Sequence, residues 1–116
     1  MKKIFFVYLL LASQAVLSAP NGAQLLFACE DALQNGFHSE RGMLCIWYVT
    51  PCDCNFGNRK DLPRVCLPKQ AQHEDLAELV IIGLREQTTL QIETAEMAAN
   101  TILAETYPCT DQSRNN

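Results

Sequence analysis

Residues 72–103 read QHEDLAELVIIGLREQTTLQIETAEMAANTIL, and their apolar pattern decides the fold class of this chain. Apolar residues recur there at the three- and four-residue spacing of amphipathic helices. The first stripe is Leu76, Leu79, Val80, Gly83 and Leu84, and the second is Ile92, Ala95, Ala99, Ile102 and Leu103. Small alanines on the second stripe allow a neighbouring helix to approach closely. The pattern predicts two packed helices on either side of Thr88 and Thr89.

Two further segments precede this helical pair. A first helix is predicted over Gly22 to Leu33, with Asn21 as its N-cap and Gly36 as the break that follows it. The next segment, residues 43–49 with the sequence MLCIWYV, is ambiguous, because a short run of β-branched and aromatic residues also suits a strand. Pro51 ends it in either case. With the helical option, the chain is predicted to be all-α, a small four-helix domain with disulfide crosslinks.

The chain begins with the pattern of a secretory leader. A charged start precedes an apolar run, which the small residues Ser18 and Ala19 close. A stable membrane span needs roughly 20 apolar residues, and this run is shorter. We therefore expect a signal peptide over residues 1–19, a disulfide-stabilised helical domain over 20–110 and a flexible tail over 111–116. The mature protein is then expected in the periplasm, with no membrane association after cleavage.

The composition indicates an acidic protein of one small domain. The formal net charge is −4, and removal of Lys2 and Lys3 with the leader takes it to near −6. Nucleic acid is not expected as a partner, because phosphate binding requires clusters of Lys and Arg that the chain lacks. An acidic surface suits a basic protein partner. A core of this size is marginal without crosslinks.

Six cysteines follow the predicted leader: Cys29, Cys45, Cys52, Cys54, Cys66 and Cys109. An oxidising compartment favours disulfides, and six cysteines permit 15 pairings among which the sequence does not choose. If Cys29 bonds to Cys45, the loop closure contributes roughly 3 kcal/mol. If Cys66 bonds to Cys109, it contributes roughly 4 kcal/mol. Cys52 and Cys54 then remain, and a bond between them across one residue would be strained.

Residues suited to catalysis or metal binding are sparse. His38 and His73 are the only histidines that could activate a cysteine nucleophile, and the cysteines are expected to be paired. Cys52-Asp53-Cys54 offers a single close cysteine pair, whereas structural zinc sites usually combine two such pairs or add histidines. We therefore expect no catalytic residues, no metal site, no cofactor and no enzymatic activity.

Several short motifs occur in a characteristic order along the chain. They are Leu25-Leu26, Cys29, Cys45, Tyr48-Val49, Cys66-Leu67-Pro68, an amphipathic helix to Leu84, an alanine-rich helix and Tyr107-Pro108-Cys109. This order resembles the Rap/Tai family, which comprises periplasmic immunity proteins of type VI secretion systems. The resemblance extends from about Gln24 to Cys109 and covers nearly the whole predicted domain.

The resemblance implies an immunity-type domain, all-helical and often a homodimer, that binds and inhibits a peptidoglycan amidase effector. Such an inhibitor occludes the active-site cleft of the amidase, partly with a protruding loop. The residues that match this loop are Glu86, Gln87, Thr88, Thr89 and Leu90. Acidic residues expected at the rim of the contact are Glu74, Asp75 and Glu78.

Two other functions remain as alternatives. An HdeA-like periplasmic acid-stress chaperone is also small, helical, exported and crosslinked, although six cysteines exceed its usual single disulfide. A secreted enzyme or toxin would need a catalytic constellation that the sequence lacks. Loss of structure at low pH with a gain of chaperone activity would favour the first, and toxicity on periplasmic expression would favour the second.

Overall fold

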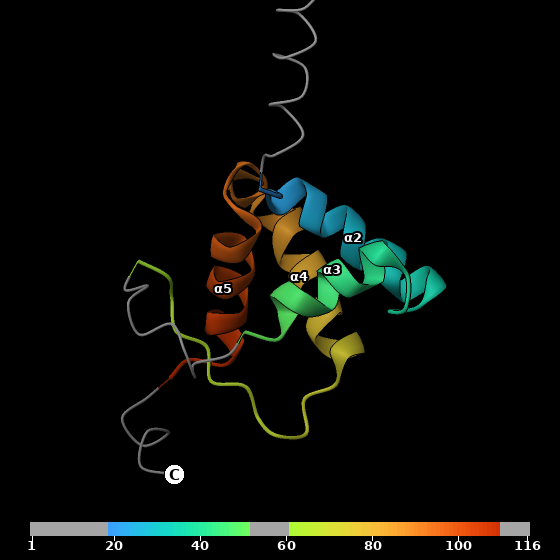
Figure 1. Ribbon diagram of the computed structural model, residues 1–116. Helices are drawn as coiled ribbons and strands as arrows, with labels where there is room; N and C mark the ends of the chain where they lie inside the picture. The colour runs from blue at the N-terminus through green and yellow to red at the C-terminus, as the bar shows by residue number, and fades with distance from the viewer. Residues whose placement is uncertain (1–18, 52–60, 110–116) are drawn as a thin grey trace, which may run out of the picture.

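The computed structural model describes residues 19–51 and 61–109. This part of the chain forms the helices α2 (Gly22–Asn35), α3 (Glu40–Val49), α4 (His73–Glu86) and α5 (Ala95–Thr106), and the short 3-10 helix η2 (Thr88–Ile92). Helix α2 packs against all the others, and η2 lies at the end of the domain where α2 begins (Figure 1). The predicted all-α class is confirmed. The predicted leader up to residue 18, Cys52, Cys54 and the tail 111–116 lie outside the described residues.

Local hydrogen bonds fix both ends of α2. The Asn21 side chain accepts a bond from the Gln24 N–H, and the Gln24 side chain accepts one from the Asn21 N–H, both at 2.9 Å. This capping box satisfies two backbone N–H groups near the helix start. The helix stops at Gly36, whose φ of 95° favours glycine. The predicted cap and the predicted break are both confirmed.

The ambiguous segment 43–49 is helical and belongs to α3. Ser39 Oγ accepts a hydrogen bond from the Gly42 N–H at 3.0 Å and caps the helix start. The buried residues Gly42, Cys45 and Val49 are three or four positions apart. The strand alternative is therefore wrong, because only the helical period turns these three residues to one side.

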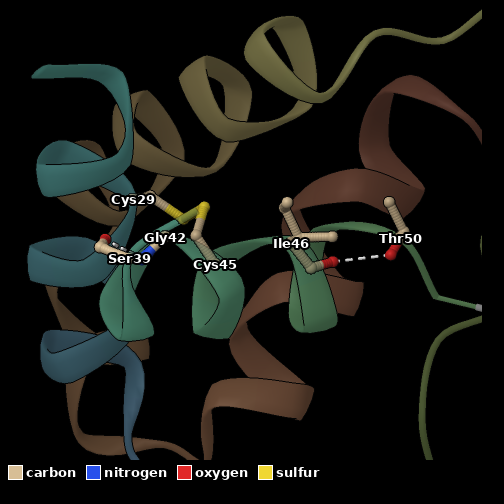
Figure 2. The surroundings of a disulfide bond; sticks show 6 residues. All are labelled: Cys29, Ser39, Gly42, Cys45, Ile46 and Thr50. Atoms are coloured by element: carbon tan, nitrogen blue, oxygen red, sulfur yellow. Dashed lines mark hydrogen bonds between the residues drawn. A yellow bond between two sulfur atoms is a disulfide. The ribbon is translucent and has the colours of Figure 1, made fainter. Parts of the chain in front are cut away.

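A disulfide joins α2 to α3. Cys29 and Cys45 are both fully buried, and their Cα atoms lie 4.9 Å apart (Figure 2). Beyond this bond, the Thr50 hydroxyl donates to the Ile46 carbonyl oxygen at 2.6 Å, where α3 ends (Figure 2). The short helix α3 is thus fixed to the domain by a covalent bond and by its buried side.

A second disulfide ties the segment before α4 to the end of α5. Cys66 bonds to Cys109, with a Cα–Cα distance of 5.1 Å. Next to it, the Cys66 N–H donates to the Tyr107 carbonyl oxygen at 3.0 Å, and Val65 forms an antiparallel bridge with Pro108. The chain around Cys66 is therefore ordered by a crosslink and by backbone pairing.

The contact between α4 and α5 is close because small residues line it. A Cβ added at Gly83 would come within 2.6 Å of a side-chain carbon of Ile102, and Ala98 and Ala99 are fully buried. Larger core side chains come from all four α-helices and include Leu25, Val49, Leu76, Val80, Leu84 and Leu103. The predicted pairing of the two C-terminal helices is confirmed.

The structure corrects the predicted start of the last helix. The sequence pattern places Ile92 on the apolar stripe of that helix, but Ile92 ends η2 and is 83% exposed. Helix α5 begins only at Ala95, because Thr94 Oγ1 accepts a hydrogen bond from the Met97 N–H at 3.2 Å and caps the helix.

None of the helices within residues 19–51 and 61–109 has the length and apolar character of a bilayer span.

Candidate functional site

The five residues predicted to bind a partner lie in one turn between α4 and α5. Glu86 ends α4, Gln87 precedes η2, and Thr88, Thr89 and Leu90 are the first three residues of η2. Glu86, Thr88 and Thr89 are exposed. Gln87 and Leu90 are half-buried, and Leu90 packs against the core. The structure therefore brings three of the five side chains to the surface and attaches the turn to the domain through Leu90.

The start of the helical domain holds this turn from one side. The Gly22 N–H donates to the Glu93 carbonyl oxygen at 2.8 Å, and the Ala95 N–H donates to the Pro20 carbonyl oxygen at 3.0 Å. An isolated antiparallel bridge lies between these two bonds. We call Pro20–Gly22 the N-terminal strap, because it pairs with the chain that leaves η2.

Close packing adds to these bonds. A Cβ added at Gly22 would overlap a backbone carbonyl oxygen of η2 and come within 2.9 Å of Gln91 Cα, so only glycine permits this approach. Gln91 Nε2 donates to the Leu84 carbonyl oxygen at 3.0 Å, and Gln87 Nε2 donates to Glu105 Oε1 at 3.0 Å. The turn is thus fixed to α2, α4 and α5 at once, and a surface fixed in this way is preorganised for binding.

The acidic residues predicted to rim the contact lie elsewhere. Glu74, Asp75 and Glu78 are exposed on the first half of α4, and roughly 12–18 Å of helix axis separates them from Glu86 at about 1.5 Å per residue. The carboxylates that flank the turn are instead those of Glu86 and Glu93, which are both exposed. The structure brings the predicted loop residues together and leaves the predicted rim residues apart from them.

The described residues offer little catalytic chemistry. His38 and His73 are exposed, and the His73 ring centroid lies 6.0 Å from that of Phe37. No group of three or more His, Cys, Asp or Glu side chains in the described ranges is placed to hold a metal ion. Burial raises the pKa of the Tyr48 phenol above its ordinary value, and the Glu96 carboxylate raises it further. The Tyr48 phenol therefore keeps its proton at neutral pH and is no nucleophile there.

The family model of the Rap1a immunity proteins matches residues 21–109. The matched range contains each described helix, the Cys29–Cys45 and Cys66–Cys109 bonds and the turn between α4 and α5. The chain belongs to the Rap1a immunity protein family. The resemblance seen in the order of the cysteine motifs is thereby confirmed. No curated protein sequence and no solved structure matches the chain significantly.

Membership assigns the general function of this Rap1a-family protein. It is an immunity protein for a toxin effector, and its class comprises inhibitors rather than enzymes. Immunity proteins act by binding effector proteins, so the partner is a protein. The disulfides and the family together indicate an exported protein.

This Rap1a-family protein also has exposed apolar side chains on α3 and α2 that were not predicted from its sequence. Met43 and Trp47 on α3 are 62% and 75% exposed, and Phe27 on α2 is 57% exposed. Cζ of Arg41 lies 4.5 Å from the centroid of the Phe27 ring, and both residues border a shallow pocket with Leu44. We call Met43 and Trp47, which lie four residues apart on one helix, the α3 face. The four-residue spacing of Met43 and Trp47 is the sequence feature that could have revealed it.

Proposed function

We propose that this Rap1a-family protein works in the periplasm and inhibits a peptidoglycan amidase effector of a type VI secretion system by occluding its active-site cleft. The family match over residues 21–109 carries the proposal, because it assigns the immunity class. The resemblance to Rap/Tai proteins supplies the amidase as the target. The exposed turn between α4 and α5 supplies a convex element that a cleft could accept.

The proposed contact is the turn Glu86–Leu90. Its backbone is held by α2, α4 and α5 before binding, so little conformational entropy is lost when a partner closes around it. The exposed hydroxyls of Thr88 and Thr89 can both donate and accept hydrogen bonds in a polar cleft. A backbone seated in the cleft excludes the substrate without any chemistry of its own.

The proposed location follows from the crosslinks and from the start of the chain. Disulfides persist in oxidising compartments such as the bacterial periplasm, and the described residues contain two of them. Residues 1–19 have the charged start, apolar run and small-residue end of a cleavable leader. Peptidoglycan borders the periplasm, so inhibitor and amidase would meet there.

The test is inhibition of peptidoglycan hydrolysis by the purified mature protein. The enzyme to test is a peptidoglycan amidase found among the products of genes neighbouring that of this chain, and the readout is the release of free amino groups from purified peptidoglycan. We expect stoichiometric inhibition by the wild-type protein. Replacing Thr88 and Thr89 with arginine should weaken it at least tenfold, since two long side chains would stand between turn and cleft. Full activity of the amidase beside excess inhibitor contradicts the function, and unchanged inhibition by the double variant excludes the turn.

Self-association is a separate part of the proposal. The α3 face presents two exposed apolar side chains, and a twofold axis through it would place each copy of Trp47 against the same helix of the other copy. Sedimentation should show a dimer that Trp47→Glu converts to a monomer. Leu33→Glu, a change at a residue 42% exposed on α2, serves as the control and should leave the dimer intact. A monomeric wild-type protein at micromolar concentration rejects this arrangement.

A further inference from the structure

The most exposed large apolar side chain of the described residues lies outside the predicted contact. Ile92 is 83% exposed and ends η2, two residues beyond the turn Glu86–Leu90. We propose that Ile92 is the apolar anchor of the partner contact, and that it enters an apolar pocket with a cationic rim on the effector. This inference rests on the proposed function and names the surface and the partner chemistry that the function requires.

The backbone around Ile92 is fixed on both sides. Before it, the Leu90 N–H donates to the Gln87 carbonyl oxygen at 2.9 Å. After it, the Glu93 N–H donates to the Leu90 carbonyl oxygen at 3.2 Å, and the Glu93 carbonyl oxygen accepts from the Gly22 N–H of the N-terminal strap at 2.8 Å. An apolar side chain on a fixed convex backbone can fill a pocket with little loss of backbone entropy, as binding anchors do.

Negative charge surrounds this apolar tip. Glu86 and Glu93 are exposed on either side of η2, and neither forms an ion pair with another described residue. The neighbouring cation, Arg85, is already paired with Glu30 at 3.0 Å. The whole chain is also acidic, with a formal charge of −4. Charge complementarity therefore predicts Lys or Arg side chains around the pocket that receives Ile92.

The shape of this surface separates it from the α3 face. The α3 face presents two apolar side chains on one helix, whereas Ile92 is a single apolar side chain between two carboxylates. A second copy of this chain would place like charges opposite one another at η2, which disfavours self-association there. A concave partner with a cationic rim therefore fits this tip better than a second copy of this chain does.

Ile92→Ala tests the anchor directly. Its expected effect is a dissociation constant for the amidase about 50-fold higher, as for removal of about three buried methyl or methylene groups. The thermal midpoint of the free protein should not change, because the side chain is exposed there. Leu33→Ala is the control, because it removes a side chain of equal size roughly 16 Å along α2 from Gly22. It should change the dissociation constant less than threefold.

The proposed cationic rim of the effector pocket is tested by removing the two carboxylates that would face it. Glu86→Gln combined with Glu93→Gln should slow association about tenfold at low salt and flatten the dependence of the association rate on ionic strength. If the wild-type protein inhibits the amidase but Ile92→Ala inhibits it equally well, the anchor is rejected while the proposed function stands. If the double glutamine variant keeps the wild-type salt dependence, the cationic rim is rejected. If the wild-type protein does not inhibit the amidase, the function and the anchor both fail.

Discussion

Replacing Gly22 with alanine should loosen the turn that carries the proposed contact. The new Cβ would overlap the Leu90 carbonyl oxygen and would lie 2.9 Å from Gln91 Cα, where ordinary contacts begin at 3.4 Å. Both opposing atoms belong to the backbone, so no side-chain rotation relieves the overlap. The N-terminal strap and η2 would have to separate by about 1 Å.

That separation determines the size of the effect. The bonds from the Gly22 N–H to Glu93 and from the Ala95 N–H to Pro20 measure 2.8 and 3.0 Å, and about 1 Å more takes both beyond hydrogen-bond range. Each contributes about 1 kcal/mol, while the helix propensity of alanine returns at most about 1 kcal/mol. We expect a net loss of about 1–2 kcal/mol in the free energy of unfolding.

The assays are urea denaturation and amide hydrogen exchange. Exchange should accelerate at position 22 and at Ala95, and inhibition of the amidase should weaken although Gly22 touches no partner. Gly83→Ala is the matched control, because the atoms nearest its Cβ would be side-chain atoms of Ile102 at 2.6–2.8 Å and none of them belongs to η2 or to the N-terminal strap. That variant should lose stability but keep slow exchange at Ala95. Wild-type stability and wild-type exchange in Gly22→Ala would refute the reasoning.

Three further predictions concern stability. Replacing Cys66 and Cys109 with alanine should lower the free energy of unfolding by about 4 kcal/mol, the loop-closure contribution for a separation of 43 residues, as checked by urea denaturation. Asn21→Ala should cost about 1 kcal/mol by removing the side-chain half of the capping box, and a loss below a few tenths of a kcal/mol would contradict that role. The pKa of Tyr48 is raised, so the folded state holds this phenol proton more firmly than the unfolded state does. The stability that this proton contributes is therefore retained below about pH 10 and is lost as the pH rises through the raised pKa. Tyr48→Phe should therefore lose less stability than the wild type in thermal unfolding between about pH 8 and pH 11, and equal losses would show that Tyr48 does not contribute.

Residues near one another in sequence made much of the fold predictable. Asn21 caps α2 by bonding to a residue three positions away, and Gly36 ends it through its own φ of 95°. Most buried residues of α4 and α5 also follow from spacing, although Leu79 of the predicted stripe is only half-buried and Ile81 is buried instead. Such features depend on local geometry, which the sequence specifies directly.

Other features depended on contacts between distant residues. The segment 43–49 suits a helix or a strand by itself, and the helix prevails because Gly42, Cys45 and Val49 then share the buried side and Cys45 reaches Cys29. Six cysteines permit 15 pairings, and only the folded chain brings the Cα atoms of Cys29 and Cys45 within 4.9 Å of each other.

The candidate site also has some features that were predictable from the sequence and others that were not. The sequence placed Glu86–Leu90 between two helices, and the resemblance implied a contact loop there, which stays a proposal. The exposure of Ile92 was not predictable, because its apolar character and spacing fit the buried stripe of the next helix. The separation of the acidic residues on α4 from the turn, in contrast, follows from the rise of the predicted helix alone, and the expected rim contact did not take it into account.

The sequence by itself determined a small helical domain with capped helices, cysteines for crosslinking and the motif order of an immunity protein. Tertiary structure decided which cysteines pair, which apolar side chains remain outside the core and how the N-terminal strap fixes η2. The physical reason is that helix spacing and capping act over three or four residues, whereas Gly22 and Glu93 meet only after the whole chain has folded.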